Sequence, residues 1–168
     1  MVPDPFQEAP SDLPLGDGAV LLGGFARPVE GALLRALAAV VDAAPFRHMV
    51  TPGGHRMSVA MTNCGAVGWV TDHTGYRYDP MDPHDGRCWP DMPDVFAALA
   101  AEAAARAGYP GFVPDACLVN SYEPGARLSP HRDRDERDFG SSIAQRSIPE
   151  GALIEVSARN PALEGGEG

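Results

Sequence analysis

Residues 116–136 read "ACLVNSYEPGARLSPHRDRDE", an apolar stretch that ends in a turn and a charged segment. Ala116 to Tyr122 is short and rich in apolar residues, which is typical of a β-strand bounded by turns. If His131 to Asp133 also lies on a strand, the imidazole and the carboxylate face the same side, because side chains alternate along a strand. With a second histidine from elsewhere they would form the facial triad that binds Fe(II). On these residues alone, the alternative is a charged loop that carries an incidental histidine.

The predicted strand before this segment carries polar side chains. Leu118, Asn120 and Tyr122 share one of its faces, because alternate residues of a strand point the same way. An amide and a phenol would therefore line the surface just ahead of the turn "EPGARLSP". Such a surface can hold a small dicarboxylate.

The composition favours one globular domain, because the chain has 168 residues, of which 44% are hydrophobic and 21% are charged. No run approaches the roughly 18 apolar residues that cross a bilayer, and the first residues are acidic, so we expect a soluble, cytoplasmic protein without membrane association. Cys64, Cys88 and Cys117 lack CxxC spacing, which argues against a disulfide framework and a zinc knuckle. A formal net charge of -10 works against nonspecific binding to phosphate backbones. Any nucleic acid must therefore be bound locally.

Periodicity predicts two helices and three strands. Apolar residues recur every three or four positions in Pro28 to Ala44 and in Pro93 to Ala107, which indicates helices packed on a sheet. Short stretches bounded by glycine, proline or aspartate predict strands at Ala19 to Gly23, Met57 to Thr62 and Ala116 to Tyr122.

Three segments together resemble the AlkB family of alkylation-repair dioxygenases, which use iron and 2-oxoglutarate. They are residues 46–69 "FRHMVTPGGHRMSVAMTNCGAVGW", residues 75–83 "GYRYDPMDP" and residues 107–136 "AGYPGFVPDACLVNSYEPGARLSPHRDRDE". The resemblance runs from about Asp17 to Asp138. It implies an α+β fold: a partial double-stranded β-helix (jelly roll) with two flanking helices and an N-terminal nucleotide-recognition lid.

The resemblance divides the chain into three parts. Residues 1–16 are expected to form an N-terminal extension, and residues 17–140 the dioxygenase domain with its lid. Residues 141–168 are expected to form a divergent, poorly ordered tail, because apart from Ala152 to Val156 this segment is polar and has little to pack.

The resemblance also implies roles for individual residues. His131 and Asp133 match iron ligands and so form the implied catalytic centre. The other implied roles are contact with 2-oxoglutarate by Leu118, Asn120 and Tyr122, stacking on the alkylated base by Trp69, contact with the base edge by Asp135, and binding of the substrate strand by Tyr76, Arg77 and Tyr78, with Thr51 and Met61 in the same region. Judged without the resemblance, a lone tryptophan such as Trp69 is more often a core or surface anchor.

The implied activity is oxidative dealkylation of bases in alkylated single- or double-stranded DNA, or in RNA, with Fe(II) and 2-oxoglutarate. A flanking set of side chains either offsets the acidity near the phosphates or is scattered surface charge; it comprises Arg47, His48, His55, Arg56, His73 and Arg77.

The family places a distal iron-binding histidine and two arginines, one of them bound to 2-oxoglutarate, after the first two ligands. No histidine follows His131 here, and beyond Arg137 the arginines are Arg146 and Arg159. A truncation or frame shift near Gly140 is therefore expected, with genuine divergence as the alternative. The alternative function is a catalytically inactive remnant that binds nucleic acid weakly at most. Nothing in the pattern predicts the oligomeric state.

Overall fold

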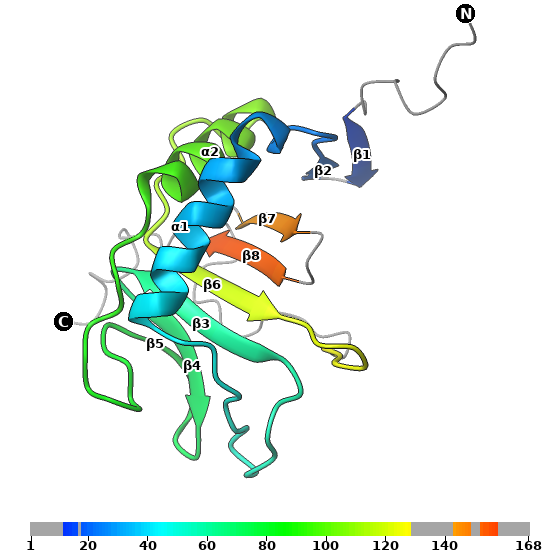
Figure 1. Ribbon diagram of the computed structural model, residues 1–168. Helices are drawn as coiled ribbons and strands as arrows, with labels where there is room; N and C mark the ends of the chain where they lie inside the picture. Colours follow the sequence, from blue (N-terminus) through cyan, green and yellow to red (C-terminus); the bar gives the residue numbers. More distant parts are fainter. Residues whose placement is uncertain (1–11, 17, 129–142, 149–151, 158–168) are drawn as a thin grey trace, which may run out of the picture.

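The computed structural model describes residues 12–16, 18–128, 143–148 and 152–157, and within these ranges it combines strands with two α-helices (Figure 1). In chain order the elements are β1 (Leu13–Gly16), β2 (Ala19–Leu21), a 3-10 helix (Arg27–Val29), α1 (Glu30–Ala43), β3 (Ala60–Gly65), β4 (Gly68–Asp72), β5 (Gly75–Asp79), α2 (Asp94–Arg106), β6 (Ala116–Ser121), β7 (Ile143–Ile148) and β8 (Ala152–Ser157).

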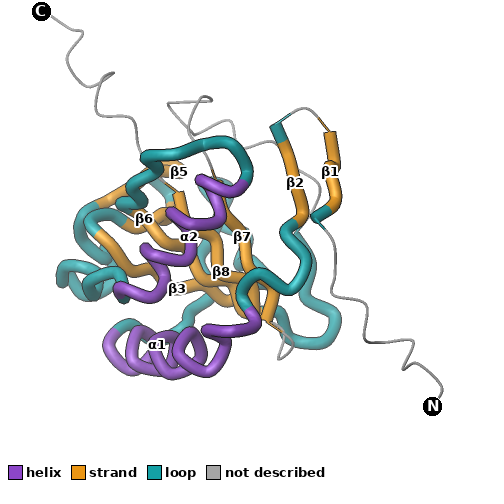
Figure 2. The backbone as a smooth tube through the Cα atoms, turned by 90° about the horizontal axis from the view of Figure 1, so that it is seen from above, coloured by secondary structure: helices purple, strands orange, loops and turns teal. Residues whose placement is uncertain are grey.

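The main sheet is antiparallel, with its strands in the order β3-β6-β8-β7. β3 and β6 pair along their full lengths, from Ala60 opposite Ser121 to Gly65 opposite Ala116. β4 and β5 form a separate hairpin beside β3, and β1 and β2 form another hairpin at the far end of the molecule (Figures 1 and 2).

Both helices cover one face of the main sheet (Figures 1 and 2). Leu33 and Val40 of α1 and Phe96 of α2 pack with Cys64 of β3 and Cys117 of β6, and all five side chains are buried. These helical residues recur with the spacing that puts apolar side chains on one stripe of a helix. Burial of that stripe against the sheet is what holds the helices in place.

The opposite face of β3 and β6 carries a second apolar cluster, which also includes residues of the β4–β5 hairpin. Met61 of β3 and Val70 of β4 are buried in it together with Trp89. We call it the hairpin-side cluster; its buried members are Met49, Val59, Met61, Val70 and Trp89, and Ala44, Met57, Trp69, Leu118, Tyr122, Ala126 and Leu128 pack against it.

The two predicted helices are confirmed. The first begins as a 3-10 turn at Arg27–Val29 and continues as α1 to Ala43, and the second is α2. The strand predicted at Ala116 to Tyr122 is confirmed as β6, and the one at Ala19 to Gly23 as β2, which ends at Leu21.

The strand predicted at Met57 to Thr62 is displaced toward the C-terminus. β3 starts at Ala60 and runs to Gly65, through residues that are typical of strand ends. The pairing partner explains the shift, because β6 supplies a hydrogen-bonding strand opposite all six residues of β3. Tertiary pairing outweighs local propensity here.

β7 and β8 lie inside residues 141–168, where the sequence predicts a tail with little to pack. β8 pairs with β6 from Ala116 opposite Ser157 to Ser121 opposite Ala152, and β7 pairs with β8. The apolar run Ala152 to Val156 therefore belongs to the main sheet. No helix in the described part of the chain has the length and apolar character to cross a bilayer.

Candidate functional site

The site is built on the face of β3 and β6 that points away from the helices. Met61 lies opposite Asn120, and Asn63 lies opposite Leu118. Side chains of directly opposed residues project from the same face of a sheet. Two apolar and two amide side chains are therefore gathered on one surface, which we call the β3–β6 face.

This face adjoins the hairpin-side cluster. Met61 is a buried member of the cluster and is 2% exposed, and Leu118 and Trp69 pack against the cluster. Tyr122, just beyond β6, also packs there. The structure thus brings together a base-stacking candidate, a substrate-facing candidate and two of the candidates for 2-oxoglutarate contact, although they come from three strands and a loop.

Asn120 contributes an uncompensated polar group to this face. It is 2% exposed, and its Oδ1 is buried without a hydrogen-bond partner among the described residues. Buried polar atoms are nearly always paired, so an amide left open in this way is suited to a ligand or a water molecule. The unpaired Oδ1 needs a donor such as a water molecule, and the NH2 group of the same amide can donate to the carboxylate of a cosubstrate.

The β4–β5 hairpin presents aromatic rings beside this face. Trp69 lies opposite Tyr78, and Tyr76 lies opposite Thr71, so their side chains share one face of the hairpin. The ring centroids of Trp69 and Tyr76 are 5.8 Å apart and the planes are inclined by 31°. Tyr76 is 44% exposed, whereas Trp69 is half-buried. A partly exposed pair of rings can offer a stacking surface to a planar ligand.

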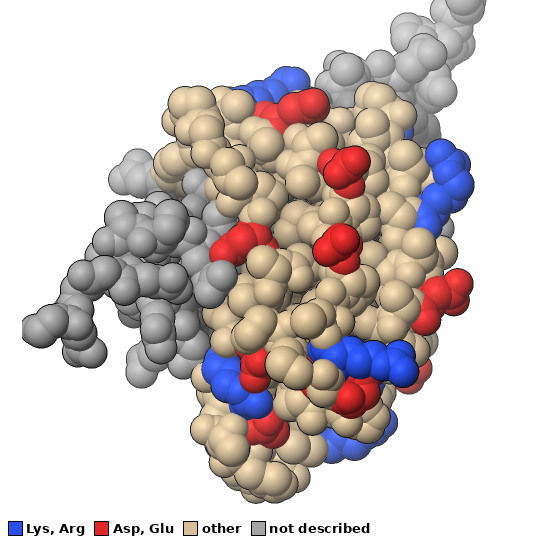
Figure 3. Space-filling view, turned by 90° about the vertical axis from the view of Figure 1, so that its left-hand side faces the viewer, with Lys and Arg blue, Asp and Glu red and all other residues tan. Residues whose placement is uncertain are grey.

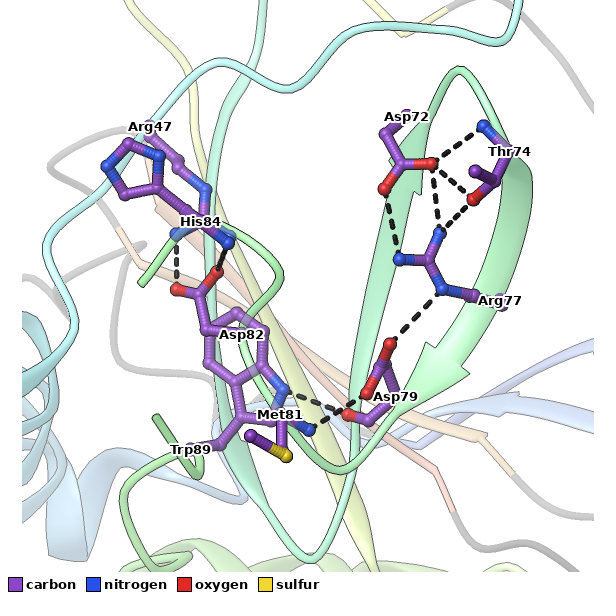
Figure 4. A network of polar contacts seen from close by, with 9 residues as sticks. All are labelled: Arg47, Asp72, Thr74, Arg77, Asp79, Met81, Asp82, His84 and Trp89. Carbon is purple, nitrogen blue, oxygen red and sulfur yellow. Dashed lines mark hydrogen bonds and ion pairs between the residues drawn. The ribbon is translucent and has the colours of Figure 1, made fainter. Parts of the chain in front are cut away.

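Arg77 lies on the other face of the hairpin, because it alternates with Tyr76 and Tyr78. Its guanidinium donates to Asp72 through two nitrogens at 3.0 Å and to Asp79 at 3.2 Å (Figure 4). Hydrogen bonds from Arg77 and from Thr74 hold the pKa of the Asp72 carboxyl well below its usual range. The structure therefore does not bring Arg77 together with Trp69, and its charge is compensated by two carboxylates.

A second ion pair fixes the loop after β5. Arg47 binds both oxygens of Asp82, and its guanidinium carbon lies 5.6 Å from the ring centroid of Trp89 (Figure 4). Burial raises the pKa of Asp82, but hydrogen bonds from Arg47 and from the His84 amide lower it by more than burial raises it. The pKa of Asp82 therefore lies below its usual value. The Trp89 indole N–H donates to the Asp79 carbonyl at 3.0 Å, which joins this loop to the end of the hairpin.

Thr51 lies in a neighbouring turn. Its hydroxyl accepts a hydrogen bond from the His55 amide at 3.2 Å, and its amide donates to the His55 carbonyl at 2.8 Å. A Cβ atom added at Gly54 would lie 3.8 Å from His73 Cε1, so this turn lies beside the tip of the β4–β5 hairpin. Thr51 thus flanks the hairpin without belonging to the hairpin-side cluster.

Charges of both signs mix on the surface. On the face drawn in Figure 3, acidic and basic side chains lie next to one another and do not form a broad basic patch. In the flanking set proposed from the sequence, Arg47 and Arg77 are both engaged by aspartates. Local contacts would therefore have to bind a nucleic acid, as the net charge of -10 predicts.

The residues predicted to bind metal, His131 and Asp133, and the predicted base-edge contact Asp135 lie outside the described residues. Leu128, the last described residue before them, packs against the hairpin-side cluster. Ser58 anchors the preceding residue, because its hydroxyl donates to the Arg127 carbonyl at 2.9 Å. Within the described ranges, no group of three His, Cys, Asp or Glu side chains could hold a metal ion.

Two residues near the site are not predicted from the sequence, Asn63 and Trp89. Asn63 is completely buried and bonds to the backbone of Trp69, and Trp89 is 6% exposed. An asparagine inside the apolar stretch "AMTNCG" was the available signal, because a buried amide must find partners.

Comparison with known proteins gives consistent relatives. Residues 18–160 match the 2OG-Fe(II) oxygenase superfamily. The alpha-ketoglutarate-dependent dioxygenase AlkB of Escherichia coli (strain K12) is 49% identical over 163 residues, which cover 96% of this chain and 73% of that protein. The protein of the same name from Salmonella typhimurium is 51% identical over 141 residues, which cover 84% of this chain and 65% of that protein.

Two more distant relatives also match this chain. The AlkB homolog of Caulobacter vibrioides is 41% identical over 131 residues, which cover 78% of this chain and 58% of that protein. The chain thus spans less than two thirds of the Salmonella and Caulobacter proteins. The solved structure of OsALKBH1 superimposes with a TM-score of 0.61 at 18% identity, over 88% of this chain and 82% of that one, which shows a shared fold.

Proposed function

The chain belongs to the AlkB family of the 2OG-Fe(II) oxygenase superfamily, and we propose that it catalyses oxidative dealkylation of damaged bases in nucleic acid. The family consists of dioxygenases that use Fe(II) and 2-oxoglutarate. One observation of this structure carries the proposal furthest: Met61, Trp69, Leu118 and Tyr122 meet in one cluster, and Asn120 lies opposite Met61 beside it.

Fe(II) is assigned to His131 and Asp133. An imidazole and a carboxylate are the donor types that Fe(II) takes in dioxygenases of this kind. When bound, Fe(II) and 2-oxoglutarate would allow dioxygen to oxidise an alkyl carbon on the base while 2-oxoglutarate is converted to succinate and CO2, after which the alkyl group would leave as an aldehyde.

2-Oxoglutarate is assigned to Leu118, Asn120 and Tyr122. The buried amide of Asn120 supports this assignment, because its Nδ2 group can donate to a carboxylate, while its unpaired Oδ1 needs a separate donor such as a water molecule. Leu118 packs on the apolar side of the same surface. Together these residues would orient the cosubstrate beside the base pocket.

The base is assigned to the Trp69 ring, with Tyr76 at the outer edge and Asp135 at the base edge. An enzyme that acts on a base must take it out of the stack, and an aromatic face compensates for the lost stacking. Tyr76, Arg77 and Tyr78 would form part of a lid that holds the flanking strand over a jelly roll, and Thr51 and Met61 would lie in the same substrate-facing region. The proposed substrate is alkylated DNA, single- or double-stranded, with alkylated RNA as the second option.

The test is turnover of a methylated single-stranded oligonucleotide by the chain with Fe(II) and 2-oxoglutarate. Succinate and aldehyde should form in equal amounts, because each oxidation consumes one cosubstrate, and their yield should be low, because no histidine follows His131 to supply the distal iron ligand. His131→Ala and Asp133→Ala should each abolish both products, whereas His84→Ala, which removes an exposed histidine next to Asp82, should leave them unchanged.

Binding of the oligonucleotide without succinate would favour the nonenzymatic alternative. If a folded, iron-loaded chain shows neither oligonucleotide binding nor succinate formation, the proposed function is refuted.

A further inference from the structure

Asn63 makes an unusual pair of hydrogen bonds with one residue of the neighbouring hairpin. Its Oδ1 accepts from the Trp69 backbone N–H at 2.9 Å, and its Nδ2 donates to the Trp69 carbonyl at 2.9 Å. Asn63 is 0% exposed, so both bonds are shielded from water. Its side chain thus supplies Trp69 with the donor and acceptor that an adjacent strand would otherwise provide.

The β4–β5 ladder leaves these two backbone groups available. Antiparallel ladders alternate between pairs that exchange backbone hydrogen bonds and pairs that do not. Trp69 and Tyr78 are opposed, yet the N–H and the C=O of Trp69 are both bonded to Asn63. They therefore point from β4 toward β3, away from β5.

This arrangement fixes the direction of the Trp69 side chain. The N–H of Trp69 belongs to the peptide plane before its Cα, and the carbonyl belongs to the plane after it. Anchoring both planes to one rigid amide restrains φ and ψ of Trp69, and with them the direction of the Cα–Cβ bond. Asn63 therefore acts on the Trp69 ring through the Trp69 backbone.

The residue before Trp69 is held equally closely. A Cβ atom added at Gly68 would lie 2.5 Å from Trp89 Cε2 and 2.7 Å from Asn63 Cβ. Only a residue without a side chain lets Trp89 and Asn63 approach the β4 backbone in this way. Asn63 and Trp89 thus hold the start of β4 from two directions.

We propose that Asn63 is a positioning residue for base binding, which acts by setting the orientation of the Trp69 ring. The inference rests on the proposed function, because it takes the Trp69 ring to be the surface on which the base stacks. It adds a residue on β3 that selects the position of the base without contacting it.

The first measurement concerns the protein alone and requires no nucleic acid. Hydrogen exchange of the Trp69 backbone amide, followed by NMR, should be slow in the wild type and at least about tenfold faster in Asn63→Ala, since the bond from this amide is removed. Asn63→Asp retains an acceptor for this amide and should keep most of its protection. It also serves where Asn63→Ala does not fold.

The second measurement is the affinity for a methylated single-stranded oligonucleotide. Asn63→Ala should weaken binding by about tenfold in the wild-type background. In a Trp69→Ala background the same change should weaken it by less than about twofold, because a residue that acts through Trp69 has no effect once the ring is gone. A merely structural role would weaken binding equally in both backgrounds.

Thr62→Val is the matched control. Thr62 precedes Asn63 and is 2% exposed, and its hydroxyl donates to the Ala44 carbonyl at 2.6 Å, on the helix side of the sheet. Its substitution removes one buried hydrogen bond from the same strand. It should change neither the exchange of the Trp69 amide nor the affinity.

The two proposals fail in different ways. Unchanged exchange of the Trp69 amide in Asn63→Ala, or equal loss of affinity in both backgrounds, would overturn the role of Asn63 and leave the proposed function standing. Absence of oligonucleotide binding by the unmodified chain would overturn the proposed function and, with it, the role of Asn63 in base binding.

Discussion

Arg77 and Asp72 form a two-point ion pair across the β4–β5 hairpin, with Nη1 donating to Oδ1 and Nη2 to Oδ2, both at 3.0 Å. Asp79 binds the same guanidinium from the other side. One positive charge therefore faces two negative charges. The charge of Arg77, which is assigned to a substrate phosphate, is thus compensated by the neighbouring carboxylates.

Asp72→Asn is predicted to strengthen binding of a methylated oligonucleotide by about two- to fivefold at low salt, because it frees part of the Arg77 charge for phosphate contact. Asparagine retains the acceptor that receives the Thr74 amide, so the hairpin turn should persist. The measurement is the dissociation constant at two salt concentrations. Asp85→Asn, which removes a surface carboxylate 4.0 Å from Arg87, is the control for net charge. Weaker binding by Asp72→Asn would show that Arg77 does not face the phosphates.

Asp82 should make stability depend on acid pH. Its pKa is lower in the folded chain than the unfolded value of about 3.9. Its stabilising contribution is therefore complete above about pH 4 and is lost as the pH falls through the folded pKa. We predict that Asp82→Asn lowers the free energy of unfolding by about 1 to 3 kcal/mol at pH 7, because it breaks the charged hydrogen bonds to Arg47.

Urea unfolding of wild type and Asp82→Asn at a series of pH values tests this. The difference in unfolding free energy between the two should be constant from pH 7 to about pH 5 and should shrink below about pH 4. A difference that stays constant down to the acid transition would contradict the role given to this carboxylate.

Trp69→Ala should weaken binding of a methylated single-stranded oligonucleotide by about 1 to 3 kcal/mol, the usual scale for stacking of a base on an aromatic ring. Tyr76→Ala should have a smaller effect of the same sign, because its ring forms the exposed edge of the pair. Tyr109→Ala is a matched control, since Tyr109 is 43% exposed against 44% for Tyr76. Its hydroxyl donates to the Gly18 carbonyl, far from the β4–β5 hairpin. Fluorescence anisotropy of a labelled oligonucleotide measures all three, and equal losses in Tyr76→Ala and Tyr109→Ala would remove Tyr76 from the binding surface.

The sequence predicts the helices well because their signal is local. The apolar stripes that include Leu33 and Val40 in α1 and Phe96 in α2 are visible in the sequence, and the structure buries them. The same holds for β6, whose alternation places Leu118 and Asn120 on one face.

The remainder depends on partners that are distant in sequence. β4 and β5 are short and contain glycine and charged residues, so they become strands only through pairing with one another. β8 joins the main sheet by pairing with β6, and β7 joins it by pairing with β8. Arg77 shows the limit for the site, because a positive residue in a family motif predicts phosphate contact, while the two aspartates that engage it become apparent only in three dimensions.

Gly68 provides a stringent test of how the hairpin is held. In Gly68→Ala the new methyl group would lie 2.5 Å from Cε2 and 2.6 Å from Nε1 of Trp89, closer than carbon contacts allow. Trp89 cannot retreat freely, because it is 6% exposed and its indole N–H is bonded to the Asp79 carbonyl. Overpacking of this kind costs about 1 to 3 kcal/mol. We therefore predict that Gly68→Ala lowers Tm by roughly 3 to 10 °C.

Gly31→Ala gives the opposite sign under the same measurement. Gly31 lies in the first turn of α1, where an added Cβ atom would lie 3.5 Å from Arg35 Nη1, an ordinary contact with a flexible side chain. Alanine in a helix is more stable than glycine by about 0.5 to 1 kcal/mol, so Tm should rise slightly. Gly68→Ala should also weaken oligonucleotide binding, because the displaced β4 backbone carries Trp69, whereas Gly31→Ala should leave it unchanged. If both variants melt at the wild-type temperature, Trp89 is not packed against Gly68 as the structure has it.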